Sequence, residues 1–186
     1  MDSTSDSALM MKVKNGDLDK LGVLFERYNR RLFGFFYRLT LRNDVSEDLV
    51  QGVFERILRY RKTYSDDGDF STWLFSIARN LHTDHYRQMK KQTIEENDAE
   101  WFLPENEHDT DMAPEEDYQK ILLQRALEKL DPDKKQALIL SRYQGFRYNE
   151  IAEIMKCSEG AVKVRVFRAI QELKEIVADL GKQEKL

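Results

Sequence analysis

Cysteine, proline and glycine are scarce in this chain of 186 residues, which has one Cys, three Pro and eight Gly. The single cysteine, Cys157, excludes an internal disulfide, and no cluster of Cys and His has zinc-finger spacing. The few Pro and Gly residues are spread among long, charged, amphipathic runs, and sustained period-two alternation is missing. We therefore expect an all-α protein.

Long hydrophobic runs are missing as well. The N-terminus has no apolar segment typical of a signal peptide, and no run is long enough to span a bilayer. This pattern predicts a cytoplasmic protein without membrane insertion. The chain is still 41% hydrophobic, with ten Phe and eight Tyr, which is enough for packed cores. Its length suits one or two small domains.

The charges divide the chain into parts. Residues 95–117 contain eleven acidic residues and no Lys or Arg, so removing them changes the net charge from −4 to +7. Pro104 and Pro114 lie in this stretch. We predict two small helical domains, 17–92 and 118–180, joined by a flexible acidic linker at 93–117, with tails at 1–16 and 181–186. The sequence leaves open whether the tails are ordered, and whether the apolar island Trp101-Phe102-Leu103 packs on this chain or docks elsewhere.

A helix-turn-helix is indicated between Gly145 and Ile170. A short helix with Ile151 and Ile154 on one side is followed by a turn at Lys156-Cys157. Ser158 is then a suitable N-cap for a second helix. The buried stripe of that helix recurs at steps of three and four residues: Val162, Val166, Ala169, Leu173, Ile176 and Leu180.

The opposite face of the second helix is basic and partly apolar. It carries Val164, Phe167, Arg168 and Gln171, and it is flanked by Lys163 and Arg165. Cations at the edges suit phosphates, whereas Arg168 and Gln171 can reach base edges in a major groove. Val164 suits a thymine methyl group, because both are apolar. The alternative is that Val164 and Phe167 pack against another protein helix.

The N-terminal block has three strongly patterned segments. An apolar stripe interleaved with Arg runs from Leu21 to Leu39, and a second amphipathic segment follows Asn43. Periodicity leaves four polar residues of this second segment outside: Asp48, Gln51, Glu55 and Arg56. The third segment, 70–91, places Trp73 and Tyr86 near cations, which suits stacking on unpaired bases. Aromatic residues at helical spacing are, however, more often core residues than base platforms.

Metal chemistry has weak support in this sequence. His82 and His85 share a helix face beside Asp84, but no other segment supplies matching ligands. We expect no metal, no other cofactor and no enzymatic activity, and we interpret Cys157 as a small turn residue.

Three motifs, in order, resemble regions 2 and 4 of bacterial sigma-70 family RNA polymerase sigma factors of the extracytoplasmic-function (ECF) group. They are DVSEDLVQGVFERI, FSTWLFSIARNLHTDHYRQ and FRYNEIAEIMKCSEGAVKVRVFRAI. The resemblance implies a dissociable initiation subunit that binds core RNA polymerase, through the coiled coil of the largest subunit and the flap, and promoter DNA. It also implies an anti-sigma partner, and a linker whose carboxylates lie in the later path of the RNA.

The resemblance assigns roles to residues. Asp48, Gln51, Glu55 and Arg56 would bind core polymerase. The minus-ten element would be melted and captured by Lys62, Trp73, Asn80, Tyr86 and Arg87. The minus-thirty-five duplex would be read by Lys163, Val164, Arg165, Phe167 and Arg168, joined by the outward Gln171. Val164 departs from the family pattern, in which Ser is frequent at this position, so the promoter sequence does not follow from the family.

Three other classes of protein remain open at this point. A free-standing helix-turn-helix regulator would bind duplex operators without polymerase and dimerise through its N-terminal block. A sigma mimic would occupy an inhibitory partner, although such a mimic should lack the cations Lys163, Arg165 and Arg168. A helical metal-dependent hydrolase would be built around His82, Asp84 and His85.

Overall fold

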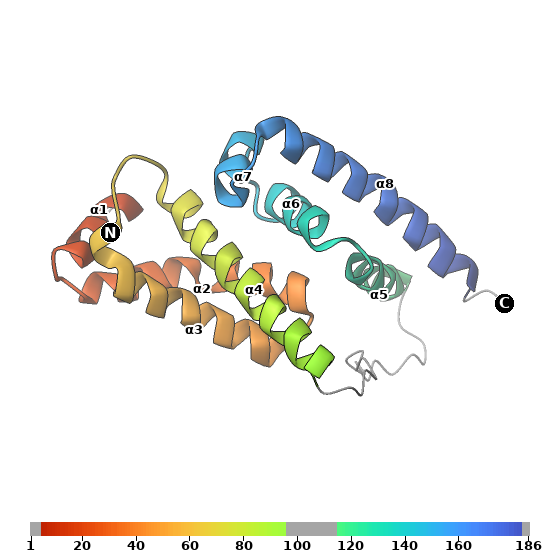
Figure 1. The fold of residues 1–186 in the computed structure, drawn as a ribbon, viewed down its shortest axis with the longest axis horizontal. Helices are drawn as coiled ribbons and strands as arrows, with labels where there is room; N and C mark the ends of the chain where they lie inside the picture. Colours follow the sequence, from red (N-terminus) through yellow and green to blue (C-terminus); the bar gives the residue numbers. More distant parts are fainter. Residues whose placement is uncertain (1–4, 96–114, 184–186) are drawn as a thin grey trace. The chain divides into compact units, whose positions relative to one another are not determined.

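The computed structural model describes residues 5–95 and 115–183, and all regular structure in these two ranges is helical. The helices are α1 (Asp6–Lys14), α2 (Asp19–Thr40), α3 (Asn43–Tyr60), the 3-10 turn η1 (Arg61–Thr63), α4 (Phe70–Glu95), α5 (Glu115–Glu128), α6 (Pro132–Arg142), α7 (Tyr148–Met155) and α8 (Glu159–Gln183) (Figure 1). The expectation of an all-α protein is confirmed.

Two compact units make up the chain. The first contains α1 to α4, and the second contains α5, α6 and α8, with α7 leading from α6 into α8. The last three residues of α4, 93–95, and the first three of α5, 115–117, fall within the predicted linker. The rest of that linker, including Trp101-Phe102-Leu103, lies outside the described residues.

The core of the first unit lies between α2, α3 and α4. Leu24, Leu32 and Phe35 of α2 are fully buried, as are Val53 and Ile57 of α3. The ring of Phe35 packs edge-on against Phe75 of α4, with centroids 5.5 Å apart. These positions recur at helical spacing because one side of each helix faces its neighbours. Phe25 lies at the edge of the predicted stripe, 37% exposed, and its ring contacts Phe54.

The N-terminal segment whose order the sequence left open forms helix α1. Ser5 Oγ accepts a hydrogen bond from Ala8 N–H at 3.2 Å, which caps the helix. At the other end Gly16 has φ +108°, and the next residue, Asp17, donates its N–H to Lys12 O at 3.0 Å. This is a Schellman ending, in which Gly avoids the steric cost of the left-handed conformation. Met10 and Val13 are fully buried, so α1 belongs to the core of this unit.

The second unit is organised around α8. Asp131 caps α6, with its carboxylate accepting from Asp133 N–H and Lys134 N–H, and Pro132 occupies the first turn. Helices α5 and α6 both pack against α8 (Figure 1). Two side chains of the first turn of α6 pair with α8, Lys134 with Glu172 at 2.5 Å and Asp133 with Arg165 at 3.2 Å.

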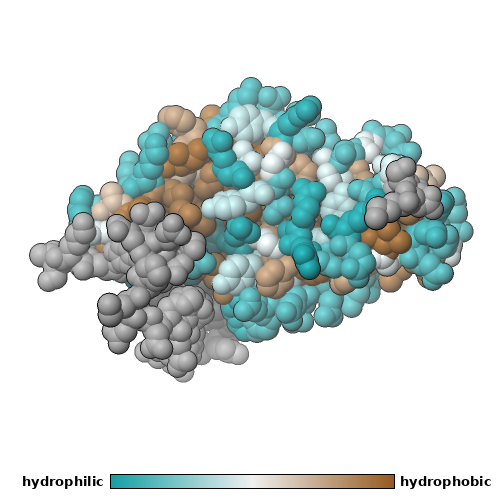
Figure 2. Space-filling model, turned by 180° about the vertical axis from the view of Figure 1, so that it is seen from behind, coloured by the Kyte–Doolittle hydropathy of each residue, from teal (hydrophilic) through white to brown (hydrophobic). Residues whose placement is uncertain are grey.

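Apolar side chains also reach the surface, where Figure 2 shows them among polar ones on the face seen from behind. Among the described residues, the large exposed apolar side chains are Leu18, Val23, Phe25, Tyr60, Tyr86, Met89, Tyr143, Val164 and Phe167. None of the described helices is both long enough and apolar enough to cross a membrane.

Candidate nucleic-acid interface

The turn between α7 and α8 is a second Schellman ending. Cys157 N–H donates to Ala152 O at 3.0 Å, and Lys156 N–H donates to Glu153 O at 3.3 Å. Lys156 has φ +53°, in the left-handed region that Gly occupies at the end of α1. Ser158 Oγ then accepts from Ala161 N–H at 3.2 Å, as an N-cap does. The turn at Lys156-Cys157 and the cap at Ser158 therefore lie where the sequence predicts them.

Helix α8 separates its predicted faces. Val162, Val166 and Ala169 are buried, and Leu173, Ile176 and Leu180 are half-buried. On the other side, Val164 is 48% exposed and Phe167 is 64% exposed. Lys163, Arg168 and Gln171 are exposed as well, and Lys163 Nζ lies 2.9 Å from Glu159 Oε1. Two apolar side chains thus stand between cations on the outer face, an arrangement that suits a groove with both phosphates and methyl groups.

Arg165 differs from its neighbours on α8. Its guanidinium donates to Cys157 Sγ at 3.1 Å and lies 3.2 Å from Asp133 Oδ2. Its side chain is only 29% exposed. Arg165 therefore connects α8 to the preceding turn and to the first turn of α6. Sequence periodicity placed Arg165, like Lys163, at an edge of the outward face, because it does not show which partners lie at that edge.

The polar side of α3 is exposed and acidic. Asp48, Gln51 and Glu55 are all exposed, and Asp44 continues the same side one turn earlier. The fourth predicted residue, Arg56, is half-buried, and its Nη2 lies 2.8 Å from Asp84 Oδ2 of α4. We call the set Asp44, Asp48, Gln51 and Glu55 the α3 face. Its charge suits a basic partner.

Trp73 lies at the boundary between core and surface. It is half-buried, and its ring packs edge-on against Tyr64, with centroids 4.8 Å apart, and at 5.9 Å from Phe70. Tyr64 follows η1, so this contact joins the 61–69 segment to α4. Trp73 is therefore packed in part against the core, and its role as a base platform stays a prediction.

The other predicted minus-ten residues lie in η1 and along α4. Lys62 is exposed in η1, and Asn80 is half-buried on α4. Trp73, Asn80 and Arg87 follow one another at seven-residue intervals, so they share a side of α4. Tyr86 is 41% exposed but points about 100° away from Arg87. Tyr86 is therefore not on the side of α4 defined by Trp73 and Asn80.

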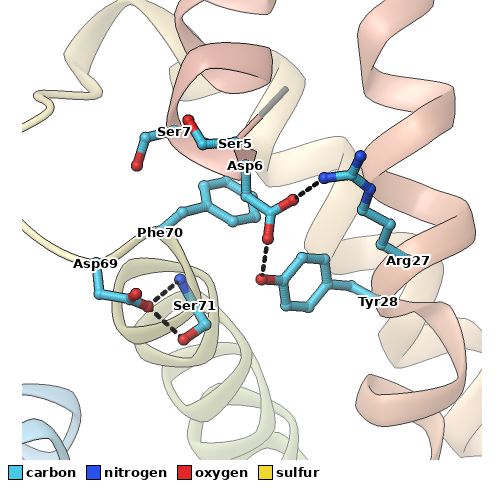
Figure 3. A pocket seen from close by; sticks show the side chains of 8 residues that line it. All are labelled: Ser5, Asp6, Ser7, Arg27, Tyr28, Asp69, Phe70 and Ser71. Carbon is cyan, nitrogen blue, oxygen red and sulfur yellow. Dashed lines mark hydrogen bonds and ion pairs between the residues drawn. The ribbon is translucent and has the colours of Figure 1, made fainter. Parts of the chain in front are cut away.

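A polar pocket of about 330 Å³ lies where α1, α2 and the start of α4 meet (Figure 3). Asp6 accepts hydrogen bonds from Arg27 at 2.5 Å and from Tyr28 at 2.6 Å. Burial, followed by the hydrogen bond to Asp6, raises the pKa of Tyr28. The Asp69 carboxylate accepts from Ser71 Oγ and, at 2.7 Å, from Ser71 N–H, which caps α4. These contacts fix the base of the loop that precedes α4.

The two histidines considered for metal binding, His82 and His85, differ in how deeply they are buried. His82 is buried and His85 is half-buried, and burial lowers the pKa of His85. Asp84 is paired with Arg56. Within residues 5–95 and 115–183, no three His, Cys, Asp or Glu side chains are grouped as metal ligands would be.

Two helical units, one of which ends in a helix-turn-helix with an exposed basic and apolar face, define a DNA-binding protein of two domains. Family comparison agrees with this class. The family "Sigma-70 region 2" matches residues 24–92, and "Sigma-70, region 4" matches residues 120–173. The chain is 31% identical to the ECF RNA polymerase sigma-E factor of Haemophilus influenzae, over 95% of this chain and 97% of that protein. It is 29% identical to the RNA polymerase sigma factor CarQ of Myxococcus xanthus, over 92% of this chain and 97% of that protein. The chain belongs to the ECF group of sigma-70 family sigma factors.

Solved structures show the same fold. The sigma factor RpoE of Bartonella quintana, in complex with the anti-sigma factor NepR, is 27% identical, with a TM-score of 0.64 over 84% of this chain and 96% of that one. CnrH, in complex with the cytosolic domain of CnrY, has a TM-score of 0.72 at 20% identity, over 95% of this chain and 99% of that one.

Proposed function

We propose that this protein is a sigma subunit that binds core RNA polymerase, recognises the minus-thirty-five and minus-ten elements and enables DNA melting. The observation that carries the proposal is the exposed face of α8, with Val164, Phe167 and Arg168, in one chain with a region 2 unit whose α3 face is acidic. A sigma factor needs a DNA-binding face and a polymerase-binding face, because the DNA contacts select the promoter and the polymerase contacts bring RNA polymerase to it. The protein has no catalytic activity and no cofactor of its own under this proposal.

Helix α8 reads the minus-thirty-five duplex. A major groove is wide enough to admit an α-helix. Lys163 meets a phosphate, and Arg168 and Gln171 reach base edges, whereas Arg165, expected from the sequence at a phosphate as well, is held by Asp133 and Cys157. Val164 and Phe167 lie between these groups and make apolar contacts. Exposed apolar side chains on a reading helix become favourable when a thymine methyl group covers them, since both surfaces leave water.

The first unit acts on the minus-ten element. Lys62 and Arg87 hold the backbone, whereas Trp73 and Asn80 offer a stacking and a hydrogen-bonding group to separated bases. Tyr86 lies on another side of α4 and offers a separate stacking group. Taking a base out of the stack costs a few kcal/mol, so a surface that already exists in the protein lowers the cost of melting. The packing of Trp73 on Tyr64 fits such a preformed surface.

The α3 face binds polymerase. Asp48, Gln51 and Glu55 extend over two turns of helix, about 10 Å along its axis. A basic partner surface would steer association and fix its register. Arg56 contributes by holding α3 to α4 through Asp84.

A protein inhibitor is the expected regulator. The Bartonella quintana sigma factor is bound to an anti-sigma factor. We propose a partner of that kind for this chain, which acts in the cytoplasm, where polymerase and chromosome are. The predicted linker permits such a partner to cover both domains.

The test is co-elution of the purified protein with bacterial core RNA polymerase in size-exclusion chromatography. Asp48→Arg reverses a charge on the α3 face and should abolish co-elution. Glu26→Arg, the same charge change at an exposed position of α2, should leave it intact. If the wild-type protein binds duplex DNA but never co-elutes, the chain is a free-standing regulator and the proposal is wrong.

A further inference from the structure

Helix α1 lies before residue 24, where the match to sigma-70 region 2 begins, yet it holds a residue of the loop that precedes α4. Lys14 Nζ donates to the main-chain carbonyl of Tyr64 at 2.5 Å, across 50 positions of sequence. Tyr64 OH donates to Ser7 Oγ at 3.2 Å. Ser7 and Lys14 are seven residues apart and therefore share one side of α1. The helix thus holds both ends of Tyr64, the carbonyl and the hydroxyl.

Tyr64 belongs to an aromatic cluster formed by Tyr28, Tyr64, Phe70 and Trp73, in which the ring of Phe70 meets the other three. Tyr64 is 1% exposed, and its ring meets Trp73 at 4.8 Å and Phe70 at 6.2 Å between centroids. Phe70 in turn meets Tyr28 at 5.4 Å. A ring that is packed on several sides has one position, so whatever fixes Tyr64 also fixes the rings that touch it.

A second contact of α1 reaches the same cluster from its other side. Asp6 accepts hydrogen bonds from Tyr28 OH at 2.6 Å and from Arg27 at 2.5 Å. The polar contacts that Asp6, Ser7 and Lys14 make thus all end on the aromatic cluster or on Arg27, the residue next to Tyr28. Lys14 is half-buried, and a charged donor in that setting forms a stronger hydrogen bond than a neutral one.

We propose that α1 is a positioning element for the minus-ten surface, by which we mean the residues expected to capture the minus-ten element, Trp73 above all. Lys14 is its main positioning residue. Lys14 and Ser7 fix Tyr64, and Tyr64 fixes the packed edge of Trp73 and the course of the chain from Lys62 to Asp69. Lys14 itself touches no DNA. This inference rests on the proposed function, because it assigns α1 to the step in which separated bases are captured. A stacking surface that is already in place loses less entropy when a base arrives than one that must form.

The experiment compares promoter opening with promoter binding in reconstituted holoenzyme. Lys14→Met removes the donor and keeps an apolar stem of similar length. Lys12→Met is the matched control, since Lys12 is exposed on the same helix and the change in charge is identical. Opening is followed by the fluorescence of 2-aminopurine in the minus-ten element, binding by retention of duplex promoter, and subunit association by co-elution. We expect Lys14→Met to slow opening about tenfold, with duplex retention and co-elution unchanged.

Two more variants make the result specific. Lys14→Arg retains a charged donor and should recover most of the opening rate. Ser7→Ala removes only the hydroxyl contact, so it should slow opening less, and it carries the test if Lys14→Met does not fold. Unchanged opening in both Lys14→Met and Ser7→Ala would overturn the inference. So would an equal loss of opening and co-elution, because α1 would then only stabilise the unit. If the wild-type holoenzyme does not open promoters, the proposed function fails instead.

Discussion

Arg56 of α3 and Asp84 of α4 form an ion pair whose Nη2 and Oδ2 atoms lie 2.8 Å apart, across 28 positions of sequence. Both side chains are partly exposed, at 32% and 49%. The pair joins the helix that carries the α3 face to the helix that carries Trp73 and Asn80. We expect a coupling free energy of about 0.5 kcal/mol, since solvent screens such pairs.

A double-mutant cycle of Arg56→Ala and Asp84→Ala in urea unfolding measures this coupling. Raising the salt concentration should reduce it. A coupling of zero at low salt would show that the pair does not join the two helices in solution.

Val164 is expected to set part of the promoter preference. Val164→Ser replaces an exposed apolar side chain with a hydroxyl, so a contact to a thymine methyl group would be lost. One base-pair position of the minus-thirty-five element should become less selective, by about 1 kcal/mol. Selection from a library randomised in this element measures the change. An unchanged preference would show that Val164 does not touch a base.

Lys163 and Arg165 are expected to differ in the salt dependence of DNA binding. An exposed Lys163 that meets a phosphate releases counterions, so Lys163→Gln should reduce the slope of log K against log salt by about 0.9. Arg165→Gln should leave the slope unchanged, because its guanidinium is held by Asp133 and Cys157. Instead it should lower the free energy of unfolding by up to about 1 kcal/mol.

Asp133→Asn is the control for Arg165, because it weakens the same ion pair from the α6 side. Its effect on unfolding should be similar, and its effect on the salt slope negligible. An equal drop in slope for Arg165→Gln and Lys163→Gln would show that Arg165 leaves Asp133 and binds phosphate.

Lys156→Gly is expected to stabilise the helix-turn-helix. Lys156 has φ +53°, a conformation that costs a residue with a Cβ about 1 kcal/mol and costs Gly little. The free energy of unfolding in urea should therefore rise by about 0.5 to 1 kcal/mol. Gly16→Ala makes the opposite change at the same position of the Schellman ending of α1, so it should lower the free energy of unfolding. The added Cβ has no neighbour within 4 Å, so the cost comes from the left-handed backbone conformation alone. A loss of stability in Lys156→Gly would contradict this account.

Asp69 is expected to make the start of α4 sensitive to acid. The hydrogen bond from the Ser71 hydroxyl is the largest cause that lowers the pKa of Asp69, followed in the same direction by those from Ser71 N–H and Thr72 N–H. A carboxylate with a lowered pKa contributes its full stability above its unfolded pKa of about 3.9, and loses it as the pH falls through the folded value. Asp69→Ala should cost about 1 kcal/mol near pH 7 and less below pH 3.

Asp69→Asn separates the cap from the charge. Asn caps a helix about as well as Asp but does not titrate in this range. Its free energy of unfolding should therefore fall less steeply between pH 5 and pH 2 than that of the wild-type protein. Equal slopes in the two proteins would show that Asp69 is not titrating as a cap.

Helix α1 is the element that sequence analysis did not find. Two of its signals are present, a Ser at the N-cap and Gly16 after the last turn. Its apolar residues, Ala8, Leu9, Met10, Met11 and Val13, are almost consecutive and so do not make a stripe that is distinctive by periodicity alone. The burial of Leu9, Met10 and Val13 against the rest of the unit identifies the helix as part of the fold, and that burial depends on residues far along the chain.

The sequence by itself determined the helical class, the two domains and the faces of α3 and α8, because helical periodicity is local and a solvent-facing side shows in the residue types of one segment. It also determined the turn at Lys156-Cys157 and the cap at Ser158. Only the tertiary structure decided that Arg165 faces Asp133, that Arg56 faces Asp84 and that Lys14 holds Tyr64. Each of these contacts joins residues that are distant in sequence, so it depends on how whole helices pack.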